Sequence, residues 1–390
     1  MNPSIIDALS KCQIGLETIL GSWQNLVEIE SYTHHPKAVA KLCGFVENKL
    51  NDLGVTTQVH HFENAGPLLI GHYGSGPISD GIILAGHMDT VFEDDFIKSN
   101  PFRVEDDQVY GPGVLDMKGG LNLIFYIIQI LKALNYTKPI KIILSGDEEN
   151  GHLHSDQNLL IEQESRGYKL AFNLETGLID NKITIARKGR LACRVATKGL
   201  AVHAGANLED GINAIHEMAY KILKIQDLNQ KYDNVTFSVG KIKGGTVPNA
   251  VPDYAEIDVD IRYEKDHLKQ HIVNDLNDII SVNHVSGATS EVFFDNEFPP
   301  FEDRYNQKAF EFIRNISAKN GLGEIAPVKL GGSSDASFIS RAGIPCLCSM
   351  GVKGQWNHSN REYALASSAA ERLVLIVDSI LEAEKVESFL

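Results

Sequence analysis

Several features that would mark other classes of protein are scarce or missing in this 390-residue sequence. The five cysteines are odd in number and include no CxxC pair, so neither a disulfide framework nor a sulfur-ligated zinc site is favoured. No uninterrupted run of about 18 apolar residues is present that would span a membrane. The N-terminal segment carries Asp7, Lys11 and Glu17, which break the apolar core of a signal peptide and favour an amphipathic helix instead. We therefore expect a soluble, cytoplasmic protein with reduced thiols.

Basic residues are also too few and too scattered for a polyanionic partner. The sequence contains 36 Lys and Arg residues and 51 Asp and Glu residues, so the formal net charge is −15. The positive residues form no clustered block. The glycine-rich stretches GHYGSG, GPGVLDMKGG and KGGTVPN have neither the GxxxxGK[ST] form nor GxGxxG between a strand and a helix. We expect no nucleic acid, nucleotide or membrane partner.

The chain is long enough for two hydrophobic cores. Residues 81–85, 139–144 and 170–174 have the composition of buried strands, and a helical pattern at 121–134 separates the first two. This strand, helix, strand order predicts a mostly parallel sheet with helices on its faces. A strand at 344–350 and a closing helix at 364–385 continue the pattern.

Residues 190–294 have a different pattern, with the predicted order strand, helix, strand, strand, helix, strand. This is the order of a ferredoxin-like unit. The sequence therefore predicts an α/β domain with a mixed, mostly parallel sheet, formed by residues 1–186 and 297–390. An α+β module of residues 187–296 is inserted into it.

Histidines and carboxylates follow the predicted strands of the α/β domain. They are His87, Asp89, Glu148, Glu149, Glu175 and His358, and Asp116 precedes the long helix at 121–134. The carboxyl ends of the strands in an open α/β sheet meet at one edge, where ligands bind. Imidazoles and several carboxylates gathered there require a cation. Nitrogen and oxygen donors favour zinc, with manganese or cobalt as alternatives, and five ligands exceed the three of a single catalytic zinc. Two ions that share one carboxylate fit better.

Each of these residues has an ordinary structural explanation when taken alone. His87 could be a core histidine, Asp116 a helix N-cap, Glu148 and Glu149 part of a solvated loop, and Glu175 an acid at a strand end. Their joint occurrence favours the metal site. We expect seven further histidines outside the motifs to be structural, namely His60, His61, His72, His152, His154, His216 and His284.

Eight motifs together resemble the di-zinc exopeptidases and deacylases that include carboxypeptidase G, acetylornithine deacetylase, succinyl-diaminopimelate desuccinylase and aminoacylase-1. The motifs are GHMDTV, GPGVLDMKGG, DEENG, LETG, KGLAVHAG, VPNAVPD, GGSSDAS and NHSNREY, and they cover nearly the whole chain. The segments ARKGR and LETG are most similar to carboxypeptidase G, which releases C-terminal glutamate.

The resemblance implies a role for each residue at the edge of the sheet. Asp116 would bridge two zinc ions, with His87 and Glu175 completing one site. Glu149 and His358 would complete the other. Glu148 would be the general base, and Asp89 would fix the tautomer of His87.

The resemblance also implies that the inserted module is a lid and dimerisation domain. His203 in KGLAVHAG would reach the active site of the partner subunit. Asn249 and Arg262 would hold the terminal carboxylate of the substrate, and Gly332 would lie in a glycine-rich loop near it. Alternatively, Arg262 is a strand arginine paired with Asp260 or Glu264.

The sequence thus predicts a homodimeric metallopeptidase that cleaves an amide bond beside a C-terminal carboxylate in a small or dipeptide-like substrate. C-terminal glutamate or a related residue would be released. Two alternatives are an N-acyl amino acid deacylase, of the acetylornithine deacetylase or succinyl-diaminopimelate desuccinylase type, and a non-catalytic metal-binding sensor. A sensor would have no use for a proton-transferring group such as Glu148.

Overall fold

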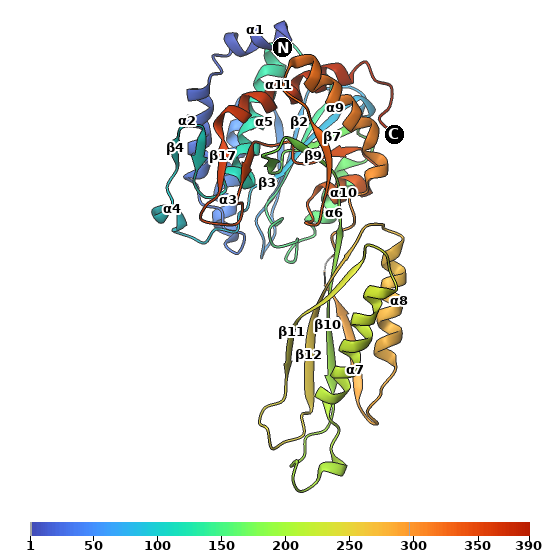
Figure 1. The fold of residues 1–390 in the computed structure, drawn as a ribbon. Coiled ribbons are helices and arrows are strands. Elements are labelled where there is room, and N and C mark those ends of the chain that lie inside the picture. The colour runs from blue at the N-terminus through green and yellow to red at the C-terminus, as the bar shows by residue number, and fades with distance from the viewer. Residues whose placement is uncertain (1, 296) are drawn as a thin grey trace. The chain divides into compact units, whose positions relative to one another are not determined.

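The computed structural model describes residues 2–295 and 297–390, which form two compact units (Figure 1). The first unit extends to Ala186 and continues with Phe301–Leu330 and Ser334–Leu390. The second unit consists of Arg187–Pro300 and Gly331–Ser333. Residue 296, at which the sequence ends the inserted module, lies outside the described residues.

A six-stranded sheet forms the centre of the first unit. Its strand order is β1 (Thr56–His60), β2 (Leu68–Tyr73), β6 (Ile140–Ser145), β3 (Ile82–His87), β7 (Leu170–Asn173) and β15 (Cys346–Leu347). The last four strands pair in parallel, whereas β1 and β2 are antiparallel at one edge. Every residue of β3 and β6 is buried, as expected for parallel strands covered on both faces. The predicted mixed, mostly parallel sheet is confirmed.

Helices surround this sheet. They are α1 (Pro3–Lys11), α2 (Leu16–Val27), α3 (Pro36–Asp52), α4 (Phe96–Ser99), α5 (Gly119–Ala133), α6 (Gln157–Ser165), α9 (Gln307–Asn320), α10 (Ala336–Arg341) and α11 (Ala366–Ala383), with short 3-10 turns at Ile78–Asp80 and Asp303–Tyr305. The segment Val114–Ala133 is long and apolar enough to cross a membrane, but 94% of its most apolar window is buried inside the protein. Its apolar character is therefore accounted for by the core.

Two expected elements of the first unit differ from the prediction. The single amphipathic helix expected at the N-terminus is divided into α1 and α2, because Gln13 adopts a φ of 53°. The strand expected at 344–350 is reduced to the two residues of β15. Pro345 has no N–H for the ladder, and Ser349 turns the backbone at a φ of 62°.

Short strands complete the first unit and join segments that are distant in sequence. One sheet has the order β4 (Arg103–Glu105), β5 (Gln108–Tyr110), β17 (Tyr363–Leu365), β16 (Lys353–Gln355) and β8 (Gly177–Leu178), and a ribbon pairs β9 (Lys182–Arg187) with β14 (Ala326–Leu330). Strands β16 and β17 are antiparallel, and the loop between them carries His358. None of the five cysteines forms a disulfide within the described residues.

The second unit has the predicted ferredoxin-like order. Its elements are β10 (Gly189–Lys198), α7 (Ala214–Asp227), β11 (Thr236–Gly244), β12 (Tyr254–Tyr263), α8 (Leu268–Ser281) and β13 (Thr289–Phe294), with 3-10 turns at Leu208–Asp210 and Leu228–Gln230. The sheet order is β11, β12, β10, β13, and all pairs are antiparallel. Helices α7 and α8 lie on one face of this sheet (Figure 1). Buried residues alternate along β12 because only that face is covered.

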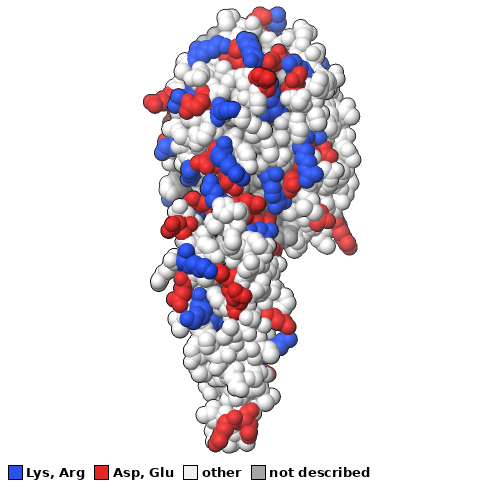
Figure 2. Space-filling view, turned by 90° about the vertical axis from the view of Figure 1, so that its right-hand side faces the viewer, with Lys and Arg blue, Asp and Glu red and all other residues white. Residues whose placement is uncertain are grey.

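Charged side chains of both signs are mixed over the face of the molecule shown in Figure 2. Lys and Arg residues there have Asp and Glu residues close by and form no continuous basic area on that face. Ion pairs between exposed side chains in the structure include Lys11 with Asp7 and Arg194 with Asp258.

Candidate metal centre

The structure brings the predicted donors together at one edge of the six-stranded sheet. His87 is the last residue of β3, Glu148 and Glu149 follow β6, and Glu175 lies two residues after β7. Asp116 comes from the Val114–Lys118 turn that precedes α5, and His358 comes from the loop between β16 and β17. The convergence follows from topology, because parallel strands end at the same edge of a sheet.

The carboxylate of Asp116 lies between the two imidazoles. Its Oδ1 is 3.1 Å from Nε2 of His87, and its Oδ2 is 3.1 Å from Nε2 of His358. Each oxygen therefore faces a different histidine, which is the geometry that a bridging carboxylate requires.

A further carboxylate lies beside each histidine. Oε1 of Glu175 is 3.7 Å from Nε2 of His87, and Oε2 of Glu149 is 3.2 Å from Nε2 of His358. Potential donor atoms of His87, Glu148 and Glu175 also lie within 4.8 Å of one another. Proximity alone therefore does not separate Glu148 from the ligands, and its role as a base stays a prediction.

The donor set suits divalent cations. His87, Asp116 and Glu175 are at most 6% exposed, and the Glu149 side chain is 5% exposed. Oε1 of Glu149 is buried and has no hydrogen-bond partner among the described residues. A buried carboxylate oxygen without a partner is costly unless a cation or proton compensates it. Imidazole nitrogens and carboxylate oxygens are donors for zinc, manganese or cobalt.

The pKa values of these groups reflect the crowding of several carboxylates in a buried place. Desolvation raises the pKa of Glu148 well above its ordinary value and raises the pKa of Glu149 to about 7. Burial also opposes ionisation of Asp116, but its hydrogen bonds with His358 and His87 hold its pKa below the ordinary value. Hydrogen bonds with Asp116 and Glu149 raise the pKa of His358 to about 11. Positive charge is needed to hold these carboxylates together.

Asp89 connects the His87 side of the site with the loop after β6. Nδ1 of His87 is 2.9 Å from the backbone carbonyl oxygen of Asp89 and 3.6 Å from its carboxylate. The carboxylate instead accepts hydrogen bonds from the backbone N–H groups of Glu148 at 3.3 Å and Glu149 at 3.0 Å. The closest acceptor for Nδ1 of His87 is thus the carbonyl oxygen of Asp89 and not its carboxylate. The carboxylate of Asp89 instead orients the loop that carries Glu148 and Glu149.

Two residues that the sequence analysis did not assign support Asp116. Nδ2 of Asn357 donates to Oδ2 of Asp116 at 2.9 Å. Glu362 is fully buried, and its Oε1 accepts the backbone N–H groups of Leu115 at 2.8 Å and Asp116 at 3.2 Å. Both residues belong to the NHSNREY motif, which was recognised in the sequence. Their hydrogen-bond partners could not be predicted, because these partners lie more than 240 positions earlier.

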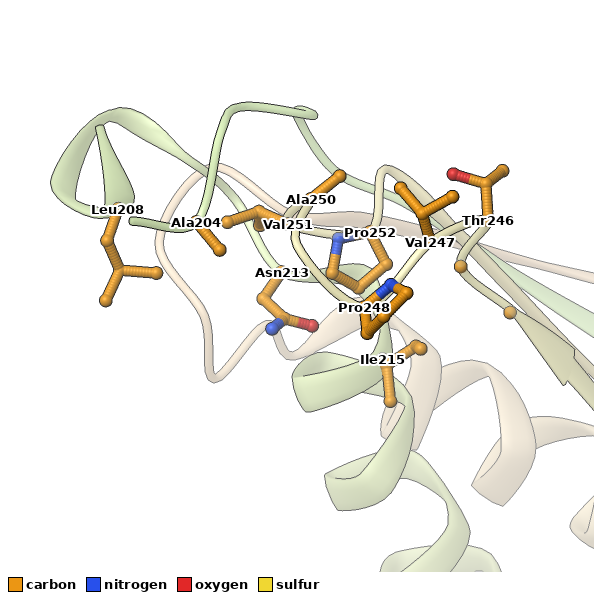
Figure 3. A pocket seen from close by; sticks show the side chains of 12 residues that line it. Ala204, Leu208, Asn213, Ile215, Thr246, Val247, Pro248, Ala250, Val251 and Pro252 are labelled. Atoms are coloured by element: carbon orange, nitrogen blue, oxygen red, sulfur yellow. The ribbon is translucent and has the colours of Figure 1, made fainter. Parts of the chain in front are cut away.

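The catalytic and substrate-binding residues predicted for the second unit occupy two separate places. His203 is exposed and forms a β-bridge with Ala250, and the carbonyl of Asn249 accepts the N–H of Ala204. A cleft of about 490 Å³ lies beside this pair of loops (Figure 3). The cleft is lined by Ala204, Leu208, Asn213, Ile215, residues 244–248 and residues 250–252.

Arg262 lies toward the other end of β12. Its guanidinium pairs with the carboxylate of Asp260, with distances of 2.8 Å from Nε and 3.3 Å from Nη2. Its Nη1 is 3.5 Å from the carbonyl oxygen of Gly331, and the next carbonyl, that of Gly332, accepts from Arg187 at 3.1 Å. The ion pair with Asp260 is the alternative that the sequence left open for Arg262.

Strand geometry separates these two places. Arg262 lies eight residues beyond Tyr254 along β12, and pairing continues past that end of the strand to the bridge between His203 and Ala250. At about 3.4 Å per residue, Arg262 is roughly 27 Å from the Tyr254 end of β12, which adjoins the His203 loop in the same chain. A dipeptide-sized substrate does not contact both.

The sequence is similar to those of known enzymes. Carboxypeptidase G2 of Pseudomonas sp. (strain RS-16) is 28% identical over 376 residues, which are 93% of this chain and 89% of the relative. Acetylornithine deacetylase of Pasteurella multocida is 29% identical over 245 residues, which are 59% of this chain and 62% of the relative.

Solved structures share the fold. Aminopeptidase PepT of Bacillus cereus has a TM-score of 0.79 at 23% identity, with 96% of this chain and 100% of that chain covered. YXEP of Bacillus subtilis, described as a dinuclear metal-binding peptidase, has a TM-score of 0.68 at 13% identity, with 95% and 99% covered.

Residues 83–382 match peptidase family M20/M25/M40, and this match spans most of the chain. The family consists of metal-dependent peptidases and amidohydrolases, so the prediction of an enzyme is confirmed in preference to a non-catalytic sensor. The chain belongs to peptidase family M20/M25/M40.

Proposed function

We propose that the protein is an exopeptidase that uses two zinc-type ions to hydrolyse an amide bond beside a free C-terminal carboxylate. The released residue would be glutamate or a related amino acid. The observation that carries the proposal is the Asp116 carboxylate, which presents one oxygen to His87 and the other to His358 at 3.1 Å each. The similarity to carboxypeptidase G2 supports the choice of substrate.

Five residues would hold the two ions. Asp116 would be shared, with His87 and Glu175 on one side and Glu149 and His358 on the other. Bound ions of this kind supply Lewis acidity to the scissile carbonyl and to the attacking water. The burial of His87, Asp116 and Glu175 limits competition from bulk water for the donor atoms.

Glu148 would transfer protons. Its carboxyl lies among the donors, close enough to share a cluster with His87 and Glu175. It would take the proton of the attacking water and return it to the departing amine nitrogen, which needs that proton to leave. Asp89 would hold Glu148 in place through the backbone N–H contact at 3.3 Å.

The second unit would bind the substrate and join two copies of the chain. Arg262 would read the terminal carboxylate, and the substrate would have to share or displace its contacts with Asp260. Because the His203 loop adjoins the end of β12 that lies roughly 27 Å from Arg262, the two would serve one substrate only from different subunits. His203 and Asn249 would therefore act across a homodimer.

An N-acyl amino acid deacylase is the second candidate, and the similarity to acetylornithine deacetylase favours it. Both reactions use the same centre and cleave an amide beside a free carboxylate. They differ in the acyl group on the carbonyl side of the bond and in the amino acid on its amine side. We also infer a cytoplasmic location, because four of the five cysteines are buried thiols without a disulfide in the described structure.

One experiment tests the function and separates the two candidates. Acyl-glutamates, other acyl-amino acids, dipeptides and their α-amides are offered to protein loaded with zinc, cobalt or manganese, and metal content is measured in parallel. We expect two ions per chain, preference for the free acid, and the highest kcat/KM with a C-terminal glutamate. Preference for acetyl or succinyl amino acids would favour the deacylase. One ion or none in fully active protein would contradict the two-ion centre.

The matched control compares two buried aspartates of the first unit. Asp116→Asn should lose bound metal and activity together. Asp378→Asn should retain both, because Asp378 contacts Asn2 and Asn320 at 2.7 Å each and none of the proposed ligands in the described structure. Equal metal loss in both variants would indicate general destabilisation and would count against Asp116 as a shared ligand.

A further inference from the structure

The loop that carries Glu148 and Glu149 has two fixed ends. It starts at Ser145, the last residue of β6, which lies opposite His87 in the parallel ladder and accepts the Met88 N–H at 2.7 Å through its carbonyl. It turns back at His152, whose N–H donates to the carbonyl of Asp147 at 2.8 Å. Ser145 and His152 are both fully buried.

A single carboxylate binds both ends of this loop. Oδ2 of Asp335 accepts the hydroxyl of Ser145 at 2.5 Å, and Oδ1 lies 2.7 Å from Nε2 of His152. Asp335 is 3% exposed. We call this group of three residues the Asp335 clamp.

The clamp is not a nucleophile with its base. In a serine nucleophile arrangement the imidazole contacts the hydroxyl and the carboxylate lies behind the imidazole. Here the carboxylate of Asp335 lies between the hydroxyl of Ser145 and the imidazole of His152. The arrangement ties two segments together, and the hydroxyl donates to the carboxylate and not to an imidazole.

Asp335 is itself held firmly. It immediately precedes α10, and its carbonyl accepts the N–H groups of Phe338 at 3.0 Å and Ile339 at 3.3 Å. The preceding hydroxyl, that of Ser334, accepts the N–H of Ala336 at 3.2 Å. The carboxylate is therefore a rigid anchor for a loop that has no regular secondary structure between β6 and α6.

The backbone of His152 needs such an anchor. Its φ of 54° lies in the left-handed region, which residues with a β-carbon rarely adopt. Conformations of this kind persist where the surrounding structure holds them. The contact with Asp335 is one of the interactions that do so.

We propose that Asp335 is a positioning residue, which closes the ends of the 145–152 loop so that Glu148 and Glu149 face the donors on β3, β7 and the Asp116 turn. The consequence for catalysis rests on the proposed function, because it requires Glu148 and Glu149 to act in the roles given above. The clamp itself does not depend on those roles. It concerns a loop conformation that is measurable without substrate.

The test uses two substitutions of Asp335 and hydrogen–deuterium exchange of the loop amides at 146–151. Asp335→Ala removes both contacts, and we expect exchange in the loop to accelerate at least about tenfold, since local opening then lacks its main restraint. We also expect kcat to fall at least about tenfold with KM within about threefold, because small misplacements of a catalytic group are costly. The amide in Asp335→Asn can accept from His152 and donate to Ser145, so this variant should stay within about threefold of the parent in both measurements.

Asp378→Ala is the matched control. Asp378 is another fully buried carboxylate of the first unit, with one oxygen 2.7 Å from Asn2 and the other 2.7 Å from Asn320. The control should lose a comparable amount of stability but retain parental loop exchange and kcat. If Asp335→Ala does not fold, Ser145→Ala removes one arm of the clamp and should raise loop exchange by a smaller factor.

Three results would overturn the proposal. They are parental loop exchange in Asp335→Ala or in its substitute Ser145→Ala, equal acceleration in the Asp378→Ala control, and loop exchange in Asp335→Asn as fast as in Asp335→Ala. The last would mean that the charge of Asp335 matters and its two contacts do not. Failure of the parent to hydrolyse any substrate would count against the proposed function, while loop exchange would still decide the clamp.

Discussion

The separation of Arg262 from the His203 loop leads to a quantitative prediction. Arg262 is eight positions from Tyr254 on β12, so at about 3.4 Å per residue one chain places Arg262 roughly 27 Å from the end of β12 that adjoins the His203 loop. A substrate with one amide bond and one carboxylate is much shorter. If both groups serve one reaction, each active site must take Arg262 from one chain and His203 from another.

Mixing two inactive variants tests this requirement. In a hybrid dimer of His203→Ala and Glu148→Gln chains, one site has an intact Glu148 and an intact His203 from the partner, and the other site lacks both. Random exchange of equal amounts gives hybrid dimers in about half of all dimers, so about a quarter of the sites, and of the parental activity, should return in a symmetric dimer. The assay is hydrolysis of an acyl-glutamate after subunit exchange, with hybrids confirmed by differently tagged chains.

Action of His203 within its own chain predicts a clearly different activity for the mixture. If His203 acts within its own chain, the hybrid contains no complete site and activity stays at the sum of the two variants. A confirmed hybrid with no recovered activity would therefore refute the action of His203 across subunits. As a control for activation by the exchange procedure itself, differently tagged His203→Ala chains are mixed with each other. This mixture should recover no activity.

Three further predictions concern the centre and its supports. Glu148→Gln should retain two ions by elemental analysis yet lose about 10²–10⁴-fold in kcat, because it removes one proton-transferring group; activity within about tenfold of the parent would exclude that role. Arg262→Ala should abolish the preference for a free acid over its α-amide, whereas Arg194→Ala, which breaks a similar strand ion pair with Asp258 at 3.3 Å, should keep it. Glu362→Ala leaves two buried backbone N–H groups without their acceptor, at a cost of about 1–3 kcal/mol each in the free energy of unfolding. Glu362→Gln keeps an acceptor there and should retain most of that stability in chemical denaturation, and equal losses in both variants would show that the charge is what matters.

The sequence alone determined the order of elements and the main donors. Strand β6 is predicted by its largely apolar run, because it is buried on both faces. Strand β12 is predicted by the alternation of apolar and polar residues, because it is buried on one face. The proposed donors other than Asp116 were predicted because each follows a predicted strand, and parallel strands bring their ends to one edge. The ferredoxin-like module was predicted from its pattern, because apolar residues recur with different periods in helices and in strands.

Only the tertiary structure decided which groups support those donors. Glu362, Asn357 and Asp335 bind partners between 183 and 247 positions away, and no local period encodes such a contact. The two three-residue strands that place His358 were not predicted either, because segments that short carry too few residues for a pattern.

The choice between two readings of Arg262 also required coordinates. A strand arginine flanked by acids can bind a substrate carboxylate or pair with its neighbour, and the sequence is the same in both cases. The structure shows the pair with Asp260 because residues two apart on a strand point to the same face. The distance from Arg262 to His203 likewise follows from strand length and register, which are fixed when the sheet assembles and not by either residue alone.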